Sequence, residues 1–414
     1  SKKEFNINLI SEALQIAITK KGPIHINVPF DEPLYETVEE LQEFNFPVVI
    51  ANETEQSVGF EKLITVWNSS ARKMILVGVE SPNEQLQSLI EQFKNDASVI
   101  ILTETTSNLT SERTINSIDK LIFPLDENQL KELQPEVLIT FGGMVVSKKI
   151  KQFLRKHQPT HHWHIDEQRA MNTFHCLSEF IQGKPLEFLS KLVSKSDKTV
   201  SNYQQKWLLE KDNRTEKHQQ YLDKIPHSDL KVFEQVLKSV PEKSQLQLSN
   251  SSIVRYAQLF DVKDSLKVFC NRGTSGIDGS TSTAIGAASV SENQTVFISG
   301  DLSFFYDSNA LWNNYIPKNF RIIIINNNGG GIFRFIPGPK TTNALEYFET
   351  SHDLTAKKLC EMYQLEYQSV SETGQLTTAL NGFYQESRKP KVLEVFTNKE
   401  VNDKVLKEYF NYLK

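Results

Sequence analysis

Two polar segments that each follow an apolar run hold the residue types most able to bind a charged ligand. Asp301 comes just after the apolar run 296–299, and Asn327 follows the run 321–325. Short apolar runs of this kind are typical of buried strands in a parallel sheet. Open α/β sheets bind ligands where their strands end, so we expect the carboxylate and the carboxamide to meet at one sheet edge. Such oxygen ligands suit Mg²⁺, which usually takes further ligands from phosphate.

The neighbouring residues add features of an anion site. The stretch 302–313 has helical character, so the backbone N–H groups just after Asp301 would point from a helix N-terminus toward an anion. The glycines 329–331 would let the backbone approach a ligand closely, because they carry no Cβ. Each half alone has a simpler interpretation, as a helix cap or an ordinary Asn-Gly turn. Together, one helix and one strand apart, they favour a site for a divalent cation and a diphosphate.

These paired segments resemble the motif of thiamin-diphosphate-dependent enzymes, which opens with Gly-Asp and closes with paired Asn. The third residue of the opening triplet is usually Gly in that family, whereas this chain has Leu302. The difference narrows the resemblance to one branch, the 2-succinyl-5-enolpyruvyl-6-hydroxy-3-cyclohexene-1-carboxylate synthases of menaquinone biosynthesis. Segments 22–35, 250–255 and 271–279 are also similar to that branch.

The resemblance implies a cofactor, a metal and the residues that hold them. Thiamin diphosphate would bind together with Mg²⁺ or Mn²⁺, and the metal ligands would be Asp301, Asn327 and the Gly329 carbonyl. Ile277 would be the apolar residue that bends the cofactor, although a plain loop hydrophobe is an equally open interpretation. The cofactor-binding residues expected from the resemblance are Ile277, Gly300, Asp301, Leu302, Ser303, Asn327, Gly329, Ile332 and Phe333.

Two dicarboxylate substrates, 2-oxoglutarate and isochorismate, are also implied by the resemblance. Guanidinium groups bind carboxylates through paired hydrogen bonds, so a pocket for such substrates needs arginine despite the net charge of −5. Lys148 has an alternative interpretation as an ordinary charged residue at an exposed helix start. Arg334, in the stretch 333–348 that we expect to form a mobile loop, is a further hypothesis for substrate binding. The expected substrate-binding residues are Lys148, Ser251, Arg255, Arg272 and Ile336.

Composition argues against several classes of protein. Hydrophobic residues make up 39% and charged residues 23% of the chain, which is typical of a soluble globular protein. No apolar run approaches the roughly 20 residues needed to span a bilayer. The acidic net charge disfavours a nucleic-acid partner. The three cysteines lack metal-ligand spacing, and the run His161–His164 lies on an expected strand with no carboxylates at metal-ligand spacing. We therefore expect a cytoplasmic protein with no nucleic-acid or membrane partner.

Alternating apolar runs and helical patterns predict an α/β protein with doubly wound parallel-sheet domains, including a smaller central α/β domain. The resemblance implies that these domains have the thiamin-diphosphate-binding fold, in three regions: 1–36 as the end of a pyrimidine-binding domain, 37–194 as the central domain, and 195–414 as the pyrophosphate-binding domain. The first would hold a helix at 8–19 and a strand at 24–28. The other expected strands are 73–79, 98–102, 137–141, 160–165, 245–248, 268–270, 296–299, 321–326 and 392–396.

One residue implied by the resemblance has no counterpart here. The glutamate that activates the cofactor lies upstream of the segment with which this chain begins, so we expect an N-terminally truncated synthase with no assignable catalytic residue and negligible turnover by itself. The family's active sites form between subunits, which implies a homodimer or homotetramer. Two alternatives stay open. One is another thiamin-diphosphate 2-oxo-acid enzyme resembling acetolactate synthase, and the other is a non-catalytic cofactor-binding fragment.

Overall fold

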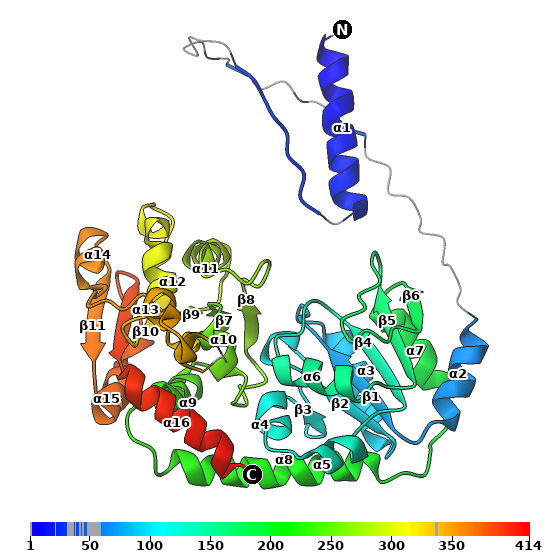
Figure 1. Cartoon of the computed structure of the whole chain (residues 1–414). Helices are drawn as coiled ribbons and strands as arrows, with labels where there is room; N and C mark the ends of the chain where they lie inside the picture. The colour runs from blue at the N-terminus through cyan, green and yellow to red at the C-terminus, as the bar shows by residue number, and fades with distance from the viewer. Residues whose placement is uncertain are drawn as a thin grey trace.

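Two separate six-stranded sheets, both wholly parallel, organise the computed structural model of the chain (Figure 1). Helices cover both faces of each sheet, which confirms the expected doubly wound α/β class. No helix among the described residues is long and apolar enough to cross a membrane. The structure describes residues 2–20, 22–30, 37, 39–40, 43, 45–47, 59–335 and 338–414.

The first sheet has the strand order β3-β2-β1-β4-β5-β6. Side chains alternate along its central strand β1: Ile75 and Val77 enter one apolar core, whereas Met74 and Leu76 enter the other. Because both faces are buried, the strand sequence is apolar from Met74 to Val77. The strands are β1 (Lys73–Val77), β2 (Val99–Leu102), β3 (Thr114–Ile115), β4 (Val137–Phe141), β5 (His161–Asp166) and β6 (Glu179–Gln182). The helices are α2 (Phe60–Ser69), α3 (Glu84–Gln92), α4 (Ile118–Ile122), α5 (Glu127–Glu132), α6 (Lys148–Lys156) and α7 (Pro185–Lys195).

The second sheet has the order β11-β12-β10-β9-β7-β8. Its central strand β10 alternates in the same way, with Ile323 and Ile325 in one core and Ile322 and Ile324 in the other. The strands are β7 (Gln245–Leu248), β8 (Lys267–Cys270), β9 (Thr295–Gly300), β10 (Arg321–Asn326), β11 (Glu366–Val370) and β12 (Lys391–Phe396). The helices are α9 (Asp229–Ser239), α10 (Ser252–Ala257), α11 (Ser280–Ser289), α12 (Asp301–Tyr306), α13 (Ala344–Glu349), α14 (Lys357–Met362), α15 (Thr373–Phe383) and α16 (Lys399–Tyr412).

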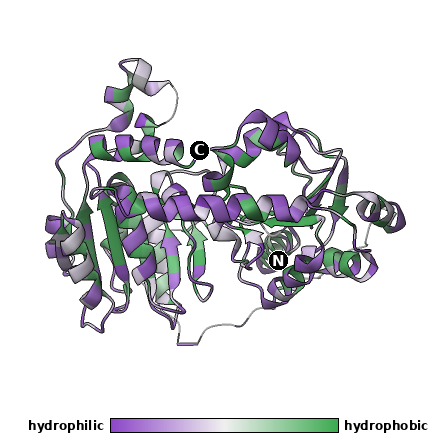
Figure 2. Cartoon of the chain, turned by 90° about the horizontal axis from the view of Figure 1, so that it is seen from below, coloured by the Kyte–Doolittle hydropathy of each residue, from purple (hydrophilic) through white to green (hydrophobic). Residues whose placement is uncertain are grey.

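One long helix, α8 (Tyr203–Leu222), runs beneath both sheets (Figure 1). Near its start, Gln204 Nε2 donates to Val99 O of β2 over 2.9 Å. Near its end, the Tyr221 hydroxyl donates to Val405 O of α16 over 2.8 Å. Figure 2, which views the chain from below, shows a largely hydrophilic surface on this helix. The helix therefore ties the two α/β units together along one side.

Two kinds of difference separate the structure from the expected elements. The strand expected at 24–28 is wrong, since residues 23–30 form no strand and pair with neither sheet; a short apolar run becomes a strand only where a partner strand is available. The helix before it, α1 (Lys2–Lys20), is longer than expected. Three strands were missed, β3, β6 and β11, because each lies at or near a sheet edge and is short or partly exposed. The domain limits stay predictions.

Candidate functional site

A cavity of about 430 Å³ lies at the carboxyl ends of β7, β9 and β10. All the expected site residues but one line it, although they come from five separate stretches of the chain. Ile336 lies outside the described residues. The lining residues among those expected are Lys148, Ser251, Arg255, Arg272, Ile277, Gly300, Asp301, Leu302, Ser303, Asn327, Gly329, Ile332 and Phe333.

Strand register explains why Asp301 and Asn327 come together. Strands β9 and β10 are parallel neighbours with Gly300 opposite Ile325, so the next residues of both strands emerge at the same edge. Gly329 N donates to Asp301 Oδ2 over 2.9 Å, which joins the two loops directly. The other carboxylate oxygen of Asp301 accepts from Leu302 N at 2.7 Å. One hydrogen bond therefore joins Asp301 to the loop that carries Asn327.

The carboxamide of Asn327 has one partnered and one unpartnered end. Its Nδ2 donates to Asp229 Oδ2 over 2.9 Å, whereas its Oδ1 is buried and has no hydrogen-bond partner among the residues that the structure describes. A buried oxygen without a hydrogen-bond partner destabilises the fold unless a ligand supplies the missing interaction. An oxygen-preferring divalent cation such as Mg²⁺ would do so. Among the described residues, no group of three His, Cys, Asp or Glu side chains gathers into a metal site, so a metal here needs carboxamide, carbonyl and phosphate oxygens as well.

Position 329 requires glycine because the backbone there passes close to the backbone of Glu349. Gly329 has φ +141°, and a Cβ there would lie 2.5 Å from Glu349 O. The Gly329 carbonyl accepts from Gly331 N at 3.0 Å, which leaves its second lone pair for another partner. The close approach expected from the three consecutive glycines is therefore present at Gly329.

Apolar residues form the opposite part of the lining. The Ser303 hydroxyl donates to the Ile277 carbonyl over 2.6 Å, which holds the loop of Ile277 against the start of α12. Phe233 and Tyr256 stack with ring centroids 5.2 Å apart and add an aromatic wall. Ile277 therefore lines the same cavity as the polar loops, and its role in bending the cofactor stays a prediction.

Two arginines give the cavity a cationic side. Arg255 on α10 donates through Nη1 to Ser251 O over 2.6 Å, and burial followed by the charge of Arg272 lowers its pKa. Arg272 donates through Nη1 to Asn250 Oδ1 over 3.1 Å, while its Nε is buried and finds no partner within the described part of the chain. Two guanidinium groups facing one pocket, one of them with an unused buried donor, suit an anionic ligand.

Lys148 reaches the cavity from the first unit. It opens α6, and the two residues before it are held by the carboxylate of Glu104, which accepts from Val146 N and Ser147 N at 2.7 Å each. Glu104 is 3% exposed, and this burial raises its pKa to about 7. The position of Lys148 therefore depends on a buried acid, Glu104, that no local pattern marks as part of a site.

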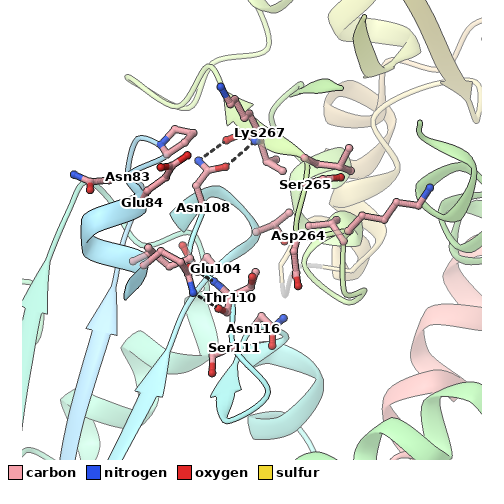
Figure 3. A pocket seen from close by; sticks show the side chains of 18 of the residues that line it. Asn83, Glu84, Glu104, Asn108, Thr110, Ser111, Asn116, Asp264, Ser265 and Lys267 are labelled. Carbon is pink, nitrogen blue, oxygen red and sulfur yellow. Dashed lines mark hydrogen bonds between the residues drawn. The ribbon is translucent and has the colours of Figure 1, made fainter. Parts of the chain in front are cut away.

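A larger cavity of about 780 Å³ lies between the two units (Figure 3). Its lining carries charges of both signs, including Glu84 and Asp264 against Lys267. Figure 3 shows Asn108 reaching across to the chain around Lys267, where its carboxamide bonds both N and O of Val268 at 2.7 and 2.9 Å. None of the expected site residues lines this cavity.

Two side chains near the cavity need separate comment. Arg334 forms an ion pair with Glu349, with one bond of 2.9 Å, and is not among the residues that line the cavity; its role in substrate binding stays a prediction. Asp229 lines the cavity yet was missed. It begins α9 far upstream of the motif, and its local sequence resembles any acidic helix start. Burial, opposed by hydrogen bonds and added to by the charge of Asp301, raises the pKa of Asp229 to about 6.

The fold and the cavity define a class of protein. Residues 35–248 match the family model described as the middle domain of thiamine pyrophosphate enzymes, and residues 251–395 match that of the thiamine pyrophosphate enzyme C-terminal TPP-binding domain. The chain is thus a member of the thiamin-diphosphate-dependent enzymes.

Full-length comparisons narrow that class. The chain is similar to proteins named 2-succinyl-5-enolpyruvyl-6-hydroxy-3-cyclohexene-1-carboxylate synthase from Flavobacterium johnsoniae (52% identity, covering 98% of this chain and 74% of the relative) and Christiangramia forsetii (49%, 100% and 73%). A protein of the same name from Bacteroides thetaiotaomicron is 35% identical over 98% of this chain and 73% of its own length. The chain belongs to this synthase family and spans about three quarters of the length of these relatives.

Proposed function

We propose that this protein decarboxylates 2-oxoglutarate and adds the resulting succinyl-semialdehyde unit to isochorismate, giving 2-succinyl-5-enolpyruvyl-6-hydroxy-3-cyclohexene-1-carboxylate for menaquinone biosynthesis. Family membership supports this reaction. The observation that carries it is a single cavity that combines the Asp301–Gly329 contact, the orphan oxygen of Asn327 and the two arginines. A cytoplasmic location and a homodimer or homotetramer with shared active sites belong to the same proposal.

The polar loops would hold the cofactor through a metal. Asp301, Asn327 Oδ1 and the Gly329 carbonyl would bind Mg²⁺ or Mn²⁺, and the cation would bind the diphosphate of thiamin diphosphate. When bound, the cofactor would supply the electron sink for loss of CO₂ from a 2-oxo acid. Gly300, Leu302 and Ser303 would border the diphosphate.

The remaining lining residues would bind and shield the substrates. Arg255, Arg272 and Lys148 would neutralise carboxylates, and the Ser251 hydroxyl would add a neutral hydrogen bond. The apolar side chains would exclude water from the reacting atoms and so strengthen these charge interactions. They are Ile277, Ile332 and Phe333, with Ile336 as a further candidate.

Calorimetric titration with thiamin diphosphate, with and without Mg²⁺, tests the proposal. We expect binding that requires Mg²⁺ and that is lost in Asp301→Ala, because that change removes the only expected metal ligand with a full charge. Asp212→Ala, an exposed acid on α8, is the matched control and should bind as the unaltered protein does. Binding that is indifferent to both Mg²⁺ and Asp301 would refute the assignment.

A further inference from the structure

A group of buried polar side chains beside the cavity has no binding role so far. Asp229, Thr397 and Asn402 lie on α9, just after β12 and on α16, and each is at most 8% exposed. Asp229 lines the cavity and accepts a hydrogen bond from Asn327. We propose that Asp229 is a positioning residue that fixes the carboxamide of Asn327 with its oxygen toward a divalent cation. The inference rests on the proposed function, because it concerns the same metal site.

The direction of these hydrogen bonds is set by a backbone N–H, which can only donate. Asp229 N donates to Asn402 Oδ1 over 2.8 Å, so the amide end of Asn402, Nδ2, faces Thr397. This Nδ2 also can only donate, and it lies 3.1 Å from Thr397 Oγ1. The Thr397 hydroxyl therefore accepts from Asn402 and gives its own proton to Asp229 Oδ1, at 2.6 Å.

The second carboxylate oxygen of Asp229 determines which end of the Asn327 carboxamide faces it. With Oδ1 accepting from Thr397, an ionised Asp229 has only acceptor capacity left at Oδ2. Asn327 must then present its NH₂ group, which donates to that oxygen over 2.9 Å. Its Oδ1 points the other way, where it is buried and unpartnered among the described residues. The carboxamide orientation that a metal needs is thus imposed from α9, the segment after β12 and α16.

Without a carboxylate behind it, the Asn327 carboxamide would lose this preference. The O and NH₂ ends of a carboxamide have similar size, so a half turn about the last side-chain bond changes only which end faces the cation. An NH₂ group cannot bind a cation. With Asp229 in place, the same turn would set two acceptors against each other, which excludes it. Groups that orient metal ligands in this way typically contribute about 10- to 100-fold in metal affinity.

Titration with Mn²⁺ tests this role, with free Mn²⁺ measured by electron paramagnetic resonance at a fixed concentration of thiamin diphosphate. Asp229→Asn keeps the size of the side chain, but the Thr397 hydroxyl would hold its oxygen and leave its NH₂ group facing Asn327. Asn327 would then turn its own oxygen away from the cation, so we expect about 10- to 100-fold weaker Mn²⁺ binding. A swap variant, Asp229→Asn with Asn327→Asp, restores one donor facing one acceptor and keeps an oxygen toward the metal. It should recover most of the affinity, whereas Asn327→Asp alone sets two carboxylates together and should not.

A matched control separates positioning from loss of a buried acid. Glu234→Gln removes another buried carboxylate of α9, one that pairs with Lys231 and Lys238 outside the cavity, and should leave Mn²⁺ binding unchanged. Unchanged Mn²⁺ affinity in Asp229→Asn, or a folded swap variant that recovers nothing, would overturn the inference alone. The swap also decides the matter should Asp229→Asn fail to fold. Absence of any Asp301-dependent Mn²⁺ binding in the unaltered protein would overturn the proposed function as well.

Discussion

At the scale of single residues, the most informative atoms are buried polar groups that lack a partner. Asn327 Oδ1 and Arg272 Nε are of this kind, one an acceptor and one a donor, and both belong to residues that line the same cavity. An orphan acceptor suits a cation and an orphan donor suits an anion. The cavity therefore offers complementary places for a metal-bound diphosphate and for a carboxylate.

Arg272 offers a test of substrate class. Arg272→Lys keeps the charge but loses the planar fork, so binding of 2-oxoglutarate to the protein loaded with cofactor and Mg²⁺ should weaken about tenfold. Pyruvate, which lacks the second carboxylate, should bind with unchanged affinity. Calorimetry measures both, with exposed Arg388→Lys as the control. Equal loss for both ligands would favour the alternative of an enzyme that acts on small 2-oxo acids.

At the scale of elements, one short turn of the first unit holds an edge strand of the second. The 3₁₀ turn η2 (Thr105–Ser107) lies between Glu104, which holds the residues before Lys148, and Asn108, which bonds Val268 of β8. Arg272 follows β8 closely. Residues 104–108 therefore help to position both Lys148 of the first unit and Arg272 of the second.

Replacement of Asn108 tests this coupling. Asn108→Ala leaves Val268 N and O unpaired. The free energy of unfolding should fall by at most about 1–3 kcal/mol for each of these two groups. Because Asn108 has φ +51°, Asn108→Gly separates backbone strain from the lost bonds. Hydrogen exchange at Val268 N–H should quicken in both variants and stay slow in Asn108→Asp, which keeps the acceptor. Unchanged exchange in Asn108→Gly would contradict the role.

At the scale of the whole molecule, buried histidines link stability to pH. His162 and His164 in β5 share the Thr140 hydroxyl at 2.9 Å each, and burial lowers the pKa of both, that of His162 to about 4. His218 on α8 has its pKa lowered to about 3 by burial and then by Lys120. The unfolded chain takes up these protons near pH 6.5 and the folded chain does not, so acid favours unfolding. Glu104 acts in the opposite direction, because its pKa is raised in the fold.

His162→Gln should reduce this acid sensitivity. For the unaltered residue, the stabilisation present above pH 6.5 is lost as the pH falls toward 4, by about 2 kcal/mol between pH 7 and pH 5. Denaturant unfolding at the two pH values measures the difference, and the variant should lose about 2 kcal/mol less than the unaltered protein. His25→Gln, at an exposed histidine, is the control. The same pH dependence in both variants would contradict the assignment.

What the sequence alone determined about this protein concerns the central strands and the residues at their ends. The runs that became β9 and β10 are apolar on both faces, so a local pattern marks them and also shows where each strand ends. Asp301 and Asn327 follow two of those ends, and adjacent parallel strands bring such positions together. Their metal-binding roles remain predictions.

Tertiary structure alone decided the partners that orient this site. Asp229, Thr397 and Asn402 meet beside Asn327 although they lie far apart in the chain, and no local pattern distinguishes them from ordinary cap and helix residues. The pairing of Arg334 with Glu349 likewise depends on how α13 folds back. Side-chain hydrogen bonds between distant segments depend on packing, whereas strand ends depend on a pattern that a few consecutive residues already contain.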